Sequence, residues 1–238
     1  MKPYKNKNST KKGQITSMFN SISGEYDFLN KIMTFGIDEV WRKKIYKIAK
    51  ESNPKIILDL ATGTADIAIE LANIQNAKII GVDISKKMLN VGSKKILKKN
   101  LKSKIHLQLG DAENIDYPDK YFDVVTIGFG VRNFENLKVG LKEAFRVLKK
   151  NGKIIILETS VPKNLIIRFF YKIFVRIFVT TLGKLFSKDK SAYNYLQKSA
   201  EKFPYGSSFV SILETVGFKN SIVESQMFGA TSIYTAEK

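Results

Sequence analysis

Acidic residues and glycines stand where short apolar runs of the chain end. Asp59 lies in the first run, and Gly63 follows it in a tight turn. Asp83 ends the second run, Asp111 follows the third, and Gly128 follows the fourth. Open parallel sheets bind ligands outside the carboxyl ends of their strands. We therefore expect these residues to lie together at one edge of a sheet and to hold a ligand there.

The order of strand, turn, helix and acidic strand end is typical of sheets that bind a nucleoside. The dinucleotide fingerprint G-x-G-x-x-G is missing, because Gly63 is the only glycine of the turn 61–65. No lysine follows it there, so a phosphate-binding P-loop is excluded as well. A nucleoside without phosphates fits better. S-adenosylmethionine, whose sulfonium and ammonium groups are cationic, suits such an acid-lined pocket.

Each of these groups has an expected contact with that cofactor. A carboxylate can accept from two hydroxyls, so Asp83 is assigned to the ribose. Asp111 would accept from the adenine amine, with the backbone of Ala112 facing the adjacent ring nitrogen; a plain turn residue at Asp111 remains an alternative. The backbone amides of Gly63 and Thr64 would approach the methionine carboxylate near a helix N-terminus. The residues expected to bind the cofactor are Asp59, Gly63, Thr64, Asp83, Asp111, Ala112 and Gly128.

The elements that must position these residues alternate along the chain. Strands are predicted at 56–60, 78–83, 104–109, 122–127 and 153–158, with helices between them at 66–72, 86–99 and 137–148. This alternation indicates βαβ units and a parallel sheet covered on both faces.

The end of the chain departs from this alternation. A helix at 208–216 is followed by two short strands, at 221–224 and 232–235, whose short connection requires antiparallel pairing. The expected fold is therefore α/β, with a mostly parallel seven-stranded sheet and one reversed strand. That Rossmann-like shape is usual in class I S-adenosylmethionine-dependent methyltransferases.

Two helical regions are expected around this sheet. Helical patterns at 14–30 and 41–52 predict an N-terminal cap over 14–52, and a helical insertion is expected over 163–205. Residues 14–238 would then form a single methyltransferase domain. The stretch 1–13 is polar and lysine-rich, so we interpret it as a disordered basic tail and not as a secretory signal.

The chain has no cysteine and a single histidine, which narrows its chemistry. Without cysteine there are no disulfides, zinc–thiolate sites or cysteine nucleophiles. His106 lies in an alternating strand pattern, which is typical of a structural or exposed residue. We therefore expect no metal site and no histidine-based catalytic triad.

The net charge of +18 leaves two kinds of partner open, a nucleic acid or an anionic membrane surface. The lysines are spread over many segments and form no single stripe, which disfavours a nucleic acid. Enzymes that methylate exocyclic amines usually carry an Asp/Asn-Pro-Pro-aromatic motif after the fourth strand. This chain has Gly128-Phe129-Gly130 there.

The stretch 165–186 is rich in aromatic and aliphatic residues and carries three cations at helical spacing. Arg168, Lys172 and Arg176 share one helical face. The cations make a membrane-spanning helix a poor fit, whereas an amphipathic helix at a membrane interface fits well. A helix that packs on the domain and walls an apolar tunnel remains an equal alternative.

Several segments resemble one family, the quinone C-methyltransferases of menaquinone and ubiquinone biosynthesis. The N-terminal signature 18–30 is similar, as are the segments 58–66, 110–114 and 129–133, the pair Trp41-Arg42, the segment 193–196 and the pair Phe203-Pro204. The matches extend from Met18 to the C-terminus. Ala65 stands where many members of the family have glycine.

The resemblance implies methylation of a ring carbon of a polyprenylated quinol by S-adenosylmethionine. Arg132 would stabilise the phenolate and hold a water, and Asn133 would orient that water or the quinol oxygen. Asp66 would be the base or hold its water, although an N-terminal helix charge is an alternative. The tyrosines expected to line the ring pocket, or else to pack in the core, are Tyr26, Tyr193 and Tyr195.

The substrate that this resemblance favours is demethylmenaquinol. A polyprenyl methoxybenzoquinol of ubiquinone biosynthesis is the alternative, and a nucleic-acid methyltransferase or a non-enzymatic membrane adaptor fits less well. A polyprenylated substrate implies a cytoplasmic protein at the inner face of the cytoplasmic membrane. Assembly into a homo-oligomer stays open.

Overall fold

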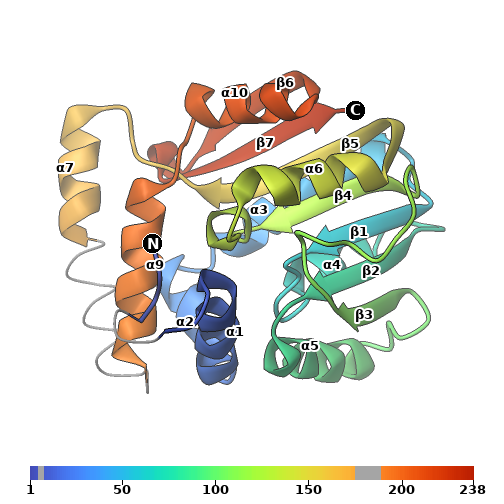
Figure 1. Cartoon of the computed structure of the whole chain (residues 1–238), viewed down its shortest axis with the longest axis horizontal. Helices are drawn as coiled ribbons and strands as arrows, with labels where there is room; N and C mark the ends of the chain where they lie inside the picture. Colours follow the sequence, from blue (N-terminus) through green and yellow to red (C-terminus); the bar gives the residue numbers. More distant parts are fainter. Residues whose placement is uncertain (5–7, 175–188) are drawn as a thin grey trace.

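A seven-stranded sheet forms the centre of the computed structural model, which describes residues 1–4, 8–174 and 189–238 (Figure 1). The strands are β1 Ile56–Leu60, β2 Lys78–Asp83, β3 Ile105–Leu109, β4 Phe122–Gly128, β5 Leu148–Thr159, β6 Lys219–Gln226 and β7 Thr231–Glu237. Their order is β3-β2-β1-β4-β5-β7-β6. Strands β1 to β5 pair parallel, and β7 pairs antiparallel with β5 and β6. The described sheet confirms the predicted fold with its reversed strand.

The predicted and observed strands agree best in β1 to β4. Strands β1 and β2 have the predicted ends, and β3 and β4 each differ by a residue at one end. Strand β5 begins at Leu148 instead of residue 153, because it also pairs with β4 before an irregular step at Asn151, where φ is 62°. Strand β6 is longer than predicted because its exposed residues carry no apolar pattern.

Helices cover both faces of the sheet. On one face, α3 (Asp38–Glu51), α4 (Asp66–Leu71) and α5 (Lys86–Lys98) contribute to one buried apolar cluster. On the other face, α6 (Leu137–Val147) and α10 (Ser207–Val216) contribute to a second. The result is the three-layer arrangement that parallel sheets require, because both of their faces are apolar.

A third apolar cluster joins α1 (Lys11–Ile22), α2 (Tyr26–Met33) and α9 (Lys190–Lys202) with Met88 at the start of α5. Figure 1 shows these helices beside the carboxyl ends of the central strands. The cap and the insertion therefore meet over the edge of the sheet where the sequence predicts a ligand. Helix α7 (Leu165–Phe174) follows β5, and none of the described helices is long and apolar enough to cross a membrane.

The N-terminal region differs from the prediction in two ways. The predicted helix 14–30 is two helices, because the chain turns between Ile22 and Tyr26 at a Ser-Gly pair. Helix α1 begins at Lys11, with the Thr10 hydroxyl accepting from the Gly13 amide as an N-cap. The expectation of a disordered tail over 1–13 is therefore wrong for its last residues.

Candidate active site

The turn after β1 is held by Asp59, which lies in the strand itself. Its carboxylate is 1% exposed and accepts from the hydroxyls of Thr62 and Thr126, each at 2.6 Å. Ala61, Gly63 and Ala65 in this turn all have positive φ, a conformation that persists for alanine only when its surroundings enforce it. One carboxylate oxygen of Asp59 thus holds the turn through Thr62, and the other ties β1 to Thr126 in the neighbouring strand β4. Asp59 borders the larger of the two cavities described below, and its direct contact with the cofactor stays a prediction.

Asp83, at the end of the neighbouring strand β2, also holds this turn. Its carboxylate accepts from the backbone amides of Gly63, at 2.8 Å, and Ser85, at 2.7 Å. The Gly63 amide is therefore engaged and is not left for the methionine carboxylate that was assigned to it. Burial raises the pKa of Asp83 to about 6 and has the same effect on Asp59.

Two cavities meet at this edge of the sheet. The smaller has a volume of about 80 Å³ and lies against Asp83, and the larger, of about 270 Å³, lies against Asp66. Five residues border both cavities: Tyr26, Ala61, Gly63, Gly128 and Phe129. Of the predicted cofactor residues, Gly63, Asp83, Asp111, Ala112 and Gly128 border the smaller cavity, while Asp59 and Thr64 border the larger alone.

The smaller cavity has the chemistry that an adenosyl group needs. The walls are largely apolar and include Ile15, Phe19, Val82, Met88 and Ala112. Asp83 presents a carboxylate whose oxygens each keep a lone pair beyond the one used by a backbone amide. A Cβ on Gly63 would meet no atom within 4 Å, so a ligand can approach that backbone closely. These residues fit S-adenosylmethionine.

Asp111 is fixed by its own turn and by the N-terminal helix. One of its oxygens accepts from the Glu113 amide at 2.9 Å, and the other pairs with the Lys12 ammonium at 2.5 Å. Lys12 also borders the smaller cavity, as do Ile15 and Phe19 of the same helix. Sequence reasoning missed Lys12 because its segment was interpreted as a tail. The Thr10 N-cap was the available signal.

Arg132 borders the larger cavity and is held by an acid that sequence reasoning missed. Its Nη1 donates to Glu158 and to the Phe129 carbonyl, the latter at 2.8 Å. The Glu158 side chain is fully buried, and that of Arg132 is 8% exposed. The Arg132 Nε is buried and has no hydrogen-bond partner among the described residues. An unpartnered donor of this kind can stabilise an anionic oxygen.

Asn133 lies against the smaller cavity, and its amide is engaged on both sides. The Nδ2 group donates to the Phe129 carbonyl, and the Oδ1 atom accepts from the Tyr195 hydroxyl, each at 3.2 Å. The described geometry therefore does not place Asn133 on the larger cavity, where a role on a quinol oxygen would require it.

The three predicted tyrosines have different positions. Tyr26 borders both cavities. Tyr195 borders neither and packs in the third apolar cluster, where burial raises its pKa to about 12. Of the two expectations for Tyr195, the structure agrees with packing in the core and not with the ring pocket, because the apolar face of its helix is buried against α1 and α2. The side chain of Tyr193 lies outside the described residues.

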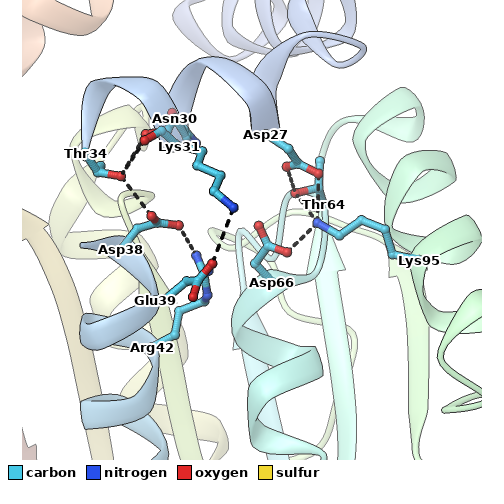
Figure 2. Close-up of polar contacts among 10 residues, drawn as sticks. All are labelled: Asp27, Asn30, Lys31, Thr34, Asp38, Glu39, Arg42, Thr64, Asp66 and Lys95. Carbon is cyan, nitrogen blue, oxygen red and sulfur yellow. Dashed lines mark hydrogen bonds and ion pairs between the residues drawn. The ribbon is translucent and has the colours of Figure 1, made fainter. Parts of the chain in front are cut away.

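Polar side chains from several helices border the larger cavity, and Figure 2 shows the contacts among them. Asp66 begins α4, as predicted, and pairs with Lys95 of α5. The same ammonium contacts Asp27 of α2 at 2.8 Å, and the Thr64 hydroxyl donates to Asp27 at 2.5 Å. On another part of the cavity border, Asp38 pairs with Arg42 and accepts from Thr34. Apart from Asp66 and Thr64, these residues were not predicted, because they come from three other helices and spacing along the chain does not bring them together.

The chain matches the model of the ubiE/COQ5 methyltransferase family over residues 5–238. The chain belongs to this family. Among curated relatives, a demethylmenaquinone methyltransferase of Bacteroides fragilis is 40% identical over 239 residues, covering 100% of this chain and 97% of the relative. A ubiquinone/menaquinone biosynthesis C-methyltransferase UbiE of Geotalea daltonii is 39% identical over 232 residues, covering 96% of this chain and 98% of the relative.

Solved structures agree with this membership at the level of the fold. A putative S-adenosylmethionine-dependent methyltransferase of Methanococcus maripaludis superposes with a TM-score of 0.66 at 21% identity, over 99% of this chain and 96% of that one. The predicted family, the class I fold and the methyltransferase activity are confirmed. S-adenosylmethionine is the cofactor of the enzyme.

Proposed function

We propose that this enzyme methylates a ring carbon of a polyprenylated quinol, with demethylmenaquinol as its substrate. The observation that carries the proposal is the junction of the two cavities, which share Tyr26 and Gly128 among five bordering residues. A cofactor in the smaller cavity and an aromatic ring in the larger would have their reacting groups at that shared border. Holding two reactants in line is a large part of catalysis.

The larger cavity supplies what carbon methylation of a quinol requires. Bound S-adenosylmethionine supplies an electrophilic methyl group. We assign the Arg132 guanidinium, which borders this cavity, to the quinol oxygen as it becomes anionic, while Glu158 keeps that guanidinium in place. Asp66 borders the same cavity and can accept the proton that the ring loses, directly or through a water.

The naphthoquinol ring is favoured over a benzoquinol by the relatives. The Bacteroides fragilis relative is named for demethylmenaquinone, whereas the Geotalea daltonii relative is named for both quinone types. Methylation of a polyprenyl methoxybenzoquinol is therefore the second candidate.

Helix α7 supports work at the inner face of the cytoplasmic membrane. Its exposed apolar residues include Leu165, Ile166, Phe169 and Phe170, which are between 61% and 75% exposed. Tyr171 of the same helix borders the larger cavity. The helix thus links an exposed apolar surface to the substrate cavity, as a prenyl tail in a bilayer would need.

A single assay tests the proposal. The purified enzyme is given labelled S-adenosylmethionine with reduced demethylmenaquinol, a reduced methoxybenzoquinol of the same tail length, or transfer RNA. We expect label on the naphthoquinol, with kcat/KM at least tenfold higher than for the benzoquinol. A reversed preference would make the second candidate correct, and label on the RNA alone would overturn the proposal.

A further inference from the structure

Lys95 reaches from the third turn of α5 to two acids on other helices (Figure 2). Its ammonium pairs with Asp66 at the start of α4 and with Asp27 in the first turn of α2. It also lies 3.3 Å from the Thr64 hydroxyl, which donates to Asp27. One cation therefore links helix α2 of the cap, the turn after β1 and the start of helix α4.

Lys95 differs from its partners in its position relative to the cavities. Asp27, Thr64 and Asp66 all border the larger cavity, whereas Lys95 does not appear among the described residues that border either one. Any influence of Lys95 on the reaction must therefore act through those acids.

Stability is a weak reason for this arrangement. The Lys95 side chain is 25% exposed and those of Asp27 and Asp66 are 36% and 39% exposed. Ion pairs at that exposure are screened by water and contribute little to folding. What the geometry does provide is orientation, because two carboxylates would repel each other without the cation between them.

We propose that Lys95 is a positioning residue that fixes Asp66 and, through Asp27, the cap helix that carries Tyr26. The inference deepens the proposed function and rests on it where turnover is concerned. Asp66 can receive a proton from a bound ring only if its carboxylate keeps a set distance and direction. Lys95 holds one Asp66 oxygen, which leaves the other for the larger cavity.

The test compares Lys95→Met with Lys95→Arg and with Lys94→Met, a matched control at the exposed neighbouring position. We expect Lys95→Met to lower kcat by about 10- to 100-fold, the range associated with a misplaced catalytic group. The KM for S-adenosylmethionine should stay within threefold, Lys95→Arg should recover most of kcat, and the control should match wild type. Adding Lys95→Met to Asp66→Asn should then cost less activity than Lys95→Met costs the wild type, because only the route through Asp27 remains.

Hydrogen exchange separates this inference from the proposed function. Lys95→Met should speed amide exchange in α2 and in the first turn of α4, and Lys94→Met should not. Unchanged exchange, or a kcat loss that merely follows a loss of folded protein, would overturn the inference. A wild-type enzyme inactive on every quinol would overturn the proposed function, while exchange would still decide whether Lys95 positions the acids.

Discussion

Arg132 must serve two acceptors with one guanidinium. Glu158 is buried and accepts from Nη1, and we assign the rest of the guanidinium to a group in the larger cavity that Arg132 borders. Removing Arg132 altogether would leave a buried carboxylate unpaired, a change that costs about 3–5 kcal/mol. With Arg132→Ala, a fall in activity could therefore reflect either loss of folded protein or loss of catalysis.

The conservative variant Arg132→Lys avoids that problem. A lysine keeps the positive charge beside Glu158 but has no planar fork and no Nε donor. We expect turnover to fall by about 100- to 1,000-fold, the range for one lost oxyanion donor, with cofactor affinity within a few-fold of wild type. Single-turnover kinetics and calorimetry measure the two effects. Near-normal turnover would make Arg132 purely structural.

Asp59 and Asp83 predict an unusual pH dependence of stability. Burial raises the pKa of each carboxyl from 3.8 to about 6, so between these values the folded state binds more protons than the unfolded state. Stability from these groups is therefore present below about pH 4 and is lost as pH rises through about 6. Each carboxyl accounts for roughly 3 kcal/mol over that range.

Asp59→Asn tests this sign, because the amide can still bond both threonine hydroxyls. We expect the variant to lose less stability than wild type between pH 4 and pH 7, as measured by urea unfolding. Asp123→Asn is the opposite control: burial of Asp123 is outweighed by hydrogen bonds from Lys149 and the backbone, and its pKa is lowered. If Asp59→Asn follows the wild-type pH curve, Asp59 is ionised without penalty.

At the scale of elements, helix α1 connects the cofactor site to the rest of the molecule, and we expect it to affect how fast the cofactor leaves. Lys12 clamps Asp111, and Lys11 donates to the carbonyls of Arg132 and Phe134. S-adenosylhomocysteine is the product left when the cofactor has given up its methyl group. Without the Lys12 ammonium, Asp111 and α1 lose a contact at the cavity. Lys12→Met should therefore raise the dissociation rate of this product several-fold and weaken its affinity by about 3- to 10-fold. Stopped-flow displacement measures this, with the exposed Lys86→Met as control. Tighter binding would mean that Lys12 competes with the cofactor for Asp111.

The strands, and the edge of the sheet where the cofactor residues lie, were predictable because each depends on residues that are close together in the sequence. Buried parallel strands are continuous apolar runs, and an acid after such a run is visible without any partner. Glu158, Lys95 and Asp27 were not predicted, because their roles depend on contacts between elements distant in sequence. The place of Tyr195 stayed open for the same reason: an aromatic residue on an amphipathic helix can face a cavity or the core.

The whole molecule combines a net charge of +18 with an exposed apolar helix beside the substrate cavity. Basic residues near an anionic surface contribute about 1 kcal/mol each, and inserted phenylalanines add to this. Three cations were predicted to share one face of the stretch 165–186. Arg168 donates to the carbonyls of Pro162 and Lys163. Arg176 lies outside the described residues. Phe169 and Phe170 are therefore the cleaner positions at which to test membrane contact.

Changing Phe169 and Phe170 together to serine should weaken binding to anionic liposomes by at least tenfold. Burying even part of two aromatic rings contributes more than the 1.4 kcal/mol that a tenfold change requires. Activity on a short-tailed, soluble quinol should stay within threefold, because neither ring borders the described cavities. Leu97→Ser, at an exposed leucine of α5, is the control for lost surface hydrophobicity. Sedimentation with liposomes that is unchanged in the double variant would place the membrane contact on another part of the molecule.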